Sequence, residues 1–164
     1  MHFLKVAALA LFPFALAAPS RRQSTSGTIV LPPDGAVIAP GEEFAFEYDC
    51  MADFGISSYN FTVWLVTSFP KSMSPSNNFA EGHYFGRFGQ PNYPGNPSPK
   101  NPPPATLTMP DFSKNPGGFG TGAVDSDGQF ALIVMEEYAT GEASIGSRFT
   151  LAVNRIVYNG TKTT

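Results

Sequence analysis

Cysteine is nearly absent from this chain of 164 residues, in which Cys50 is the single copy. An intramolecular disulfide is therefore excluded, although secreted domains of this size often contain several. Cys50 is interpreted as a small buried hydrophobe. The alternative is a free thiol that reacts, or that joins two chains through an intermolecular disulfide.

Histidine is almost as scarce, with two copies in the whole chain. Zinc and copper centres normally use two or three imidazole or thiolate ligands, and His83 and Cys50 alone do not supply them. A Ser-His-Asp triad would depend on His83, and no Gly-x-Ser-x-Gly motif accompanies it. We therefore expect no metal site, no cofactor and no serine-hydrolase chemistry.

Charge is also sparse, since Asp, Glu, Lys and Arg make up 14% of the chain and the formal net charge is −3. No cluster of Lys or Arg is present to neutralise phosphate groups. Nucleic acids and anionic membrane surfaces are therefore not expected partners. The sequence leaves the oligomeric state open.

Long apolar runs are restricted to the N-terminus. A charged start is followed by the apolar run Val6–Leu16 and by small residues, which is typical of a secretory signal peptide covering residues 1–17. Residues 18–26 are expected to form a disordered lead, in which Arg21-Arg22 is a candidate processing site. No later run approaches the roughly 20 apolar residues of a membrane span. We expect a protein that is secreted to the extracellular space or the cell wall.

The remaining sequence has the composition of strands and turns. Gly and Pro each occur 16 times and Phe occurs 15 times, which disfavours helices. Apolar residues alternate most clearly along two segments, where the members of one face are Phe44, Phe46 and Tyr48, and then Tyr59, Phe61, Val63 and Leu65. This period of two predicts half-buried strands.

Turn residues divide the chain into eight expected strands. They are Thr28–Leu31, Ala36–Ile38, Glu42–Tyr48, Tyr59–Thr67, His83–Phe88, Thr106–Met109, Gln129–Glu137 and Ser147–Tyr158. The proline-rich segment 90–104 is expected to be an extended surface loop. The pattern predicts an all-β fold, an immunoglobulin- or fibronectin-III-like antiparallel β-sandwich of seven to eight strands. It forms a single domain at 27–160, followed by a short tail at 161–164.

Short motifs along the domain resemble those of known fungal proteins. They are Pro33-x-Gly35, Pro40-Gly41, Thr108-Met-Pro110 and Ser147-Arg-Phe149. The arrangement resembles small secreted basidiomycete proteins of unknown function. More distantly, it is similar to the N-terminal immunoglobulin-like domain of Ser/Thr-rich GPI-anchored proteins and of yeast β-1,6-glucan assembly proteins of the cell wall. The resemblance implies a cell-wall β-sandwich with no catalytic residue to carry over. The stalk and anchor signal of that family do not follow here, so attachment by that route is not expected.

Acidic residues offer two candidate sites, and the local pattern argues against both. Glu136 and Glu137 are adjacent on an expected strand, where successive side chains point to opposite faces, so they do not act together on one bond. Solvation at a strand end explains them better. Asp125-Ser-Asp127-Gly128 resembles part of a calcium loop but lacks the other ligands of an EF-hand. Asp-Gly before a strand predicts a turn instead.

The aromatic segment 83–93 offers the best candidate binding surface. Flat rings beside amides and a guanidinium suit sugars, because sugar C–H groups stack on rings while hydroxyls form hydrogen bonds. The expected glycan-binding residues are Tyr84, Arg87 and Tyr93, together with Trp64 on the strand at 59–67. The alternative is that these rings fill the core of the sandwich.

Two sequons predict N-glycosylation, at Asn60 and at Asn159. Asn159 ends the last expected strand and should be accessible. Asn60 shares a strand face with Trp64, so a glycan there requires that face to be exposed. The sequence does not decide between a glycan at Asn60 and a buried Trp64.

Three functions remain open from the sequence. The first is a non-enzymatic secreted protein that binds, or is part of, cell-wall or extracellular polysaccharide. The second is an effector-like or structural protein whose partner is another extracellular protein, or a second copy joined through Cys50. The third is a glycan-active hydrolase with a carboxylate pair drawn from Asp111, Asp125, Asp127, Glu136 and Glu137. An exposed aromatic strip would favour the first, a large apolar patch the second, and two carboxyls in one cleft the third.

Overall fold

The computed structural model describes residues 27–53, 56–66, 82–91, 96–112, 128–138 and 148–159. Several predictions fall outside these ranges. They are the signal peptide and lead at 1–26, the Arg21-Arg22 site, Tyr93, the carboxylates Asp125 and Asp127, and the tail at 161–164. In the described ranges, no helix has the length and hydropathy needed to cross a membrane.

The described residues form ten strands. They are β1 (Thr28–Leu31), β2 (Ala36–Ile38), β3 (Glu43–Ala45), β4 (Glu47–Asp49), β5 (Ala52–Asp53), β6 (Ile56–Val66), β7 (Gly82–Gly89), β8 (Thr106–Thr108), β9 (Gly128–Tyr138) and β10 (Arg148–Tyr158). The three longest, β6, β9 and β10, have 11 residues each and pair antiparallel with β9 in the middle.

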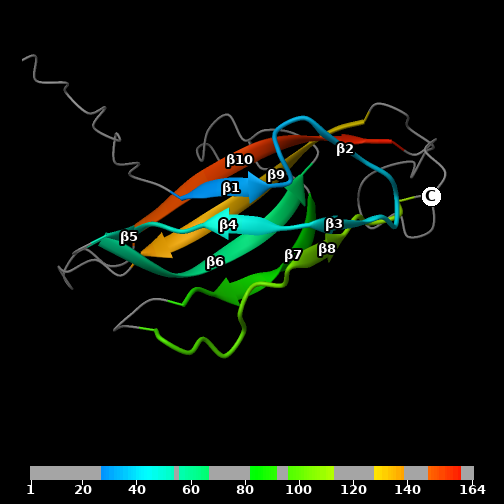
Figure 1. Ribbon diagram of the computed structural model, residues 1–164. Coiled ribbons are helices and arrows are strands. Elements are labelled where there is room, and N and C mark those ends of the chain that lie inside the picture. Colours follow the sequence, from blue (N-terminus) through cyan, green and yellow to red (C-terminus); the bar gives the residue numbers. More distant parts are fainter. Residues whose placement is uncertain are drawn as a thin grey trace, which may run out of the picture.

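The strands form two layers, as expected for a sandwich (Figure 1). The larger sheet has the order β2-β10-β9-β6-β5, and β7 pairs with β6. The second layer consists of the β1–β4 and β3–β8 pairs. In Figure 1, β1, β4 and β3 run across the larger sheet. The prediction of an all-β sandwich is confirmed.

Three details differ from the sequence prediction. The strand expected at 42–48 is divided into β3 and β4, because Phe46 between them donates its amide to Ala105 while β3 and β4 pair with different partners. The short β5 was not expected, so the strand number in the described ranges is ten rather than seven to eight. One pair, β2 with β10, is parallel. β1 and β2 follow each other along the chain but join opposite layers.

The core lies between the two layers and is rich in aromatic rings. Phe61 on β6 has no exposed surface. Its ring centroid lies 5.0 Å from that of Tyr48 and 6.3 Å from that of Phe46, both from the second layer. Phe88 on β7 is 5.8 Å away on the same sheet as Phe61. The alternating pattern of 44–48 and 59–65 therefore supplies the inner faces of both layers.

Candidate functional site

The outer face of the larger sheet, which points away from the second layer, carries exposed aromatic rings. Trp64 on β6 lies opposite Tyr84 on β7, and their ring centroids are 4.7 Å apart with planes tilted by 46°. Trp64 keeps 37% of its surface exposed and Tyr84 keeps 47%. These two rings, the Trp64–Tyr84 pair, form a continuous aromatic surface that is open to solvent.

A β-bulge places Tyr84 and Arg87 on the same face of β7, although residues three apart in a regular strand point to opposite faces. Gly86 lies opposite Val63, whereas Tyr84 lies opposite the next residue of β6, so Phe85 has no opposite residue. Gly86 has a φ of 153°, and a Cβ there would lie 2.8 Å from another ring of β7. Glycine at this position therefore allows the bulge that brings both binding candidates to the outer face.

Two neighbours hold Arg87 in a fixed orientation. Its Nε donates to Glu137 Oε1 at 2.9 Å, and its Nη2 donates to Oε2 at 2.6 Å. The Asn60 amide, with its oxygen turned toward Arg87, accepts from Nη2 at 3.2 Å and donates to the Tyr59 carbonyl at 3.1 Å. The hydrogen bonds from Arg87 keep the pKa of Glu137 below its usual value, and those to Glu137 raise the pKa of Arg87. Both groups therefore stay charged, and the Arg87 side chain is half exposed.

A polar pocket of about 480 Å³ lies beside Arg87. Tyr59 and Asn60 from β6 form one side of it together with Arg87, and the segment 96–101 forms the other. Asn60 and Trp64 are four residues apart on one face of β6, or about 13 Å. The pocket and the Trp64–Tyr84 pair are therefore neighbouring parts of one surface.

The segment 96–101 is attached to the edge of β7 by hydrogen bonds that both segments donate. The Gly89 amide donates to the Asn101 carbonyl at 2.6 Å. The Asn101 side chain donates to the Arg87 carbonyl at 2.5 Å, and the Asn96 side chain donates to the Gln90 carbonyl at 2.9 Å. This part of the proline-rich segment is thus one wall of the pocket.

The structure brings together three of the four predicted binding residues. Trp64, Tyr84 and Arg87 share the outer face, and Tyr93 lies outside the described residues. Sequence reasoning missed the pocket residues Tyr59, Asn96, Lys100 and Asn101. The Asn and Ser residues among the prolines were the available signal, but their attachment to β7 depends on tertiary contacts.

Glu136 contradicts the prediction that the Glu136-Glu137 pair is solvated. Its side chain has no exposed surface. Oε2 accepts hydrogen bonds from the Gly27 amide at 2.9 Å, the Tyr48 hydroxyl at 2.9 Å and the Tyr138 hydroxyl at 2.6 Å. Oε1 accepts one from the Met51 amide at 2.7 Å. We call these five residues the Glu136 cluster.

The position of Glu136 explains both its burial and its ionisation. β9 is an interior strand, and Glu136 lies on its inner face between the two layers, whereas Glu137 points to the outer face. Burial raises the pKa of Glu136, but hydrogen bonds from Ser58, Tyr138, Met51 and Gly27 lower it more, so the carboxylate stays ionised. A buried anion with this many donors stabilises the contact between layers and does not reach a ligand.

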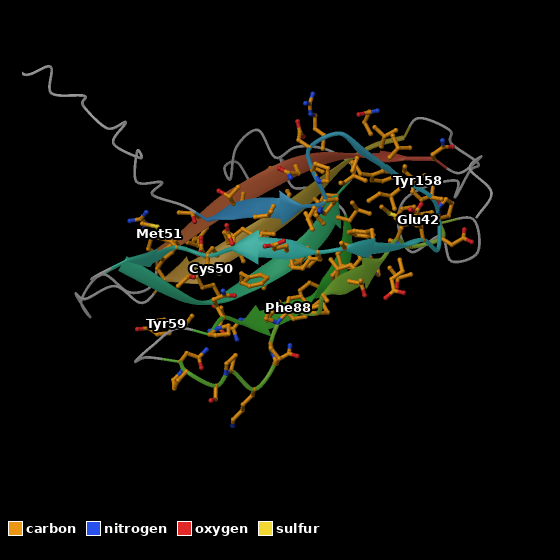
Figure 2. All side chains as sticks on the ribbon, in the orientation of Figure 1. Glu42, Cys50, Met51, Tyr59, Phe88 and Tyr158 are labelled. Atoms are coloured by element: carbon orange, nitrogen blue, oxygen red, sulfur yellow. The ribbon has the colours of Figure 1, made fainter. Side chains whose placement is uncertain are left out.

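Cys50 lies next to the Glu136 cluster, beside Met51 at one end of the sandwich (Figure 2). It is half-buried and packs against the core. Burial raises the pKa of its thiol to about 12, and Glu136 acts in the same direction. Such a thiol is a poor nucleophile at neutral pH, which supports the interpretation as a small hydrophobe.

Cys50→Ala is expected to lower the free energy of unfolding by about 1–2 kcal/mol, because it removes one packed sulfur atom and leaves a small cavity. Urea denaturation of both proteins measures the change. The wild type should also run as a monomer on a non-reducing gel. A dimer band that disappears with reductant would show that Cys50 joins two chains, and would contradict its interpretation as a small packed hydrophobe.

The sequon at Asn60 has an unusual threonine. Thr62 is 92% buried, since its relative exposure is 8%, and its hydroxyl has no hydrogen-bond partner in the part of the chain that the structure describes. Asn60 itself is half-buried at the pocket wall. Asn159, after β10, is half-buried and its backbone amide donates to Ile38. Glycosylation at both sites stays a prediction.

Thr62→Val is expected to raise the free energy of unfolding by about 1 kcal/mol, because it replaces a buried unpaired hydroxyl by a methyl group of similar size. The same change removes the sequon and leaves Asn60 in place, so the mass of the secreted protein reports whether Asn60 carries a glycan. Asn60→Gln removes the sequon but keeps the hydroxyl and should give no such gain. A loss of stability in Thr62→Val would show that the hydroxyl has a partner.

In the described ranges, no three His, Cys, Asp or Glu side chains lie together in a way that could hold a metal ion. Of the proposed hydrolase carboxylates, Asp125 and Asp127 lie outside the described ranges. Asp111 is half-buried after β8, and Glu136 and Glu137 point to opposite faces of β9. The groups present on the outer face can stack, form hydrogen bonds and form ion pairs.

Comparisons with known proteins show distant similarity to solved structures. No family model matches the chain, and no curated protein matches it. Among solved structures, the extended catalytic domain of H. jecorina LPMO9A, also called EG4, is similar with a TM-score of 0.40 and 11% sequence identity. The match covers 80% of this chain and 50% of that one, so this chain spans about half the length of that structure. A likeness of this size carries no argument about function.

Proposed function

We propose that this protein is a secreted, non-enzymatic β-sandwich that binds cell-wall or extracellular polysaccharide on the outer face of its larger sheet. The observation that supports it is the Trp64–Tyr84 pair, two adjacent exposed rings with centroids 4.7 Å apart. Sugar rings stack their C–H faces on such surfaces, and sugar hydroxyls find partners in neighbouring polar groups. Arg87 and the polar pocket supply those groups on the same face.

Co-sedimentation with insoluble polysaccharides tests this function. The purified protein is mixed with a panel of fungal and plant cell-wall polysaccharides, and both the protein in the pellet and the sugar released into solution are measured. We expect at least one polysaccharide to remove the protein from solution without release of soluble sugar. Absence of retention by every polysaccharide would contradict the proposal.

The same experiment tests the hydrolase alternative. A hydrolase needs two carboxyl groups facing one cleft. Glu136 is buried in its cluster and Glu137 is paired with Arg87, so neither supports that chemistry. Release of soluble sugar by the protein would contradict the proposal that it is non-enzymatic.

A second candidate function, binding to another extracellular protein, is supported by apolar residues that extend the outer face onto β9 and β10. Phe149 is 51% exposed, and Met135, Leu151 and Val153 are half-buried. Apolar surfaces of this kind are common in protein interfaces. If a second copy is the partner, sedimentation velocity will show concentration-dependent dimers that Phe149→Ser removes. A monomer at all concentrations would exclude self-association.

A further inference from the structure

The polar pocket has an unbalanced charge. Its charged lining residues are Arg87 and Lys100, and no Asp or Glu is among the described residues that line it. Arg87 is paired with Glu137 beside the pocket, so Lys100 carries the uncompensated positive charge of the lining. Such a local excess favours an anionic group in a ligand.

Arg87 is oriented so that part of its guanidinium remains available. Glu137 takes Nε and one hydrogen of Nη2, and Asn60 takes the other hydrogen of Nη2. Nη1 has no hydrogen bond to the described residues, so within these ranges its two hydrogens are unoccupied. Both oxygens of Glu137 are occupied by Arg87, which reduces the repulsion between Glu137 and an incoming anion. A guanidinium fixed in this way suits a carboxylate.

Lys100 supplies the second cation from the opposite wall. Its side chain is exposed, and it has no ion-pair partner in the described ranges. The segment that carries it is attached to β7 through Asn96 and Asn101. Those bonds use the amide nitrogens, so the two Oδ1 atoms can accept hydrogen bonds from sugar hydroxyls.

We propose that this pocket binds the carboxylate of an acidic sugar, so that the protein recognises polysaccharides containing uronic acid units. This inference rests on the proposed function, because it names the class of polysaccharide that the outer face binds. Lys100 and Nη1 of Arg87 bind the carboxylate, Asn96 and Asn101 accept from hydroxyls, and the Trp64–Tyr84 pair stacks on a neighbouring unit of the same chain. Charge-assisted hydrogen bonds make the carboxylate the preferred group.

Two forms of one polysaccharide test the inference. Polygalacturonate and its fully methyl-esterified form have the same backbone, but only the first carries carboxylates. Binding of both is measured by affinity electrophoresis with the chain purified from a host that attaches no N-glycans, so that Asn60 at the pocket wall is unmodified. Enzymatic removal of a glycan would convert Asn60 to Asp and place a carboxylate in the pocket. We expect at least tenfold tighter binding of the acidic form, weakened by rising ionic strength.

Variants identify the pocket as the source of this preference. Lys100→Gln is expected to reduce the preference for the acidic form at least fivefold while retaining binding to the esterified form through the ring pair. Arg155→Gln is the matched control, since it removes an exposed arginine that is ion-paired with Asp34 outside the pocket. It should leave the preference unchanged.

The outcomes separate this inference from the proposed function. Equal binding of the two forms, or an equal effect of Lys100→Gln and Arg155→Gln, would overturn the acidic-sugar pocket and leave polysaccharide binding in place. Binding of neither form, together with no retention by any polysaccharide in the co-sedimentation panel, would overturn both.

Discussion

Replacing Glu136 by glutamine is expected to lower the free energy of unfolding by about 3 kcal/mol. The carboxylate accepts hydrogen bonds from donors in both layers, and bonds to a charged acceptor contribute about 1.5–3 kcal/mol each. A glutamine amide can replace one oxygen, but its NH₂ then faces a donor such as the Met51 amide. The loss is a large part of the 5–15 kcal/mol by which domains are usually stable. Secretion of the variant is expected to fall accordingly.

The same carboxylate predicts a loss of stability in acid. The fold keeps the pKa of Glu136 below its usual value of 4.5, so the folded state favours the ionised form. Its contribution to stability is complete above pH 4.5 and is lost as the pH falls below 4.5 through the pKa of the folded protein. Urea denaturation at several pH values should therefore show a steep decline in the wild type and a shallower one in Glu136→Gln.

Glu137→Gln is the matched control for both measurements. It changes the neighbouring residue in the same way but affects an exposed ion pair with Arg87, which contributes at most about 1 kcal/mol. Its stability should stay close to that of the wild type, and its decline in acid should remain nearly as steep. Equal stability of Glu136→Gln and Glu137→Gln would contradict the role assigned to the Glu136 cluster.

Removing the Tyr84 ring is expected to weaken polysaccharide binding about tenfold, which corresponds to about 1.4 kcal/mol. Nearly half of the ring is exposed, so Tyr84→Ala loses stacking on the ligand but leaves no closed cavity in the core. Its melting temperature should stay within a few degrees of the wild type. Trp64→Ala should weaken binding further but also cost stability, because most of its surface is covered.

Val30→Ala provides a control away from the outer face. Val30 on β1 has an exposure of 38%, close to that of Trp64, but belongs to the second layer. The Val30→Ala variant should bind polysaccharide as tightly as the wild type. Tyr84 would instead be structural if Tyr84→Ala melted at a much lower temperature and the polysaccharide still retained it to the same extent as Val30→Ala.

Local patterns were sufficient to predict the strands that build the core. The alternation of Phe44, Phe46 and Tyr48 predicted their common burial, and all three are at least 92% buried, since their relative exposures are 8%, 5% and 8%. Trp64 and Tyr84 were both proposed as binding residues from their chemistry. Their contact follows from the pairing of β6 with β7, which alternation within one strand does not specify.

The features missed from the sequence depend on residues far apart in the chain. Glu136 is buried because Gly27 and Met51, 109 and 85 residues away, supply its donors. In the sequence, Glu136 and Glu137 are adjacent carboxylates near a strand end, and that pattern is typical of solvated residues. Likewise, the pocket forms only when the segment 96–101 attaches to β7, and the bulge at Gly86 reverses the face on which Arg87 lies.

The fluorescence of Trp64 tests most directly whether the outer face is the binding surface, because it is the only tryptophan of the chain. Soluble oligosaccharides prepared from a polysaccharide that retains the protein are titrated into it while emission and quenching by iodide are recorded. We expect a saturable change in emission and protection from iodide, with a midpoint equal to the oligosaccharide concentration that releases the protein from the insoluble polysaccharide. Release of the protein with no change in either signal would place binding elsewhere and contradict the assignment of this face.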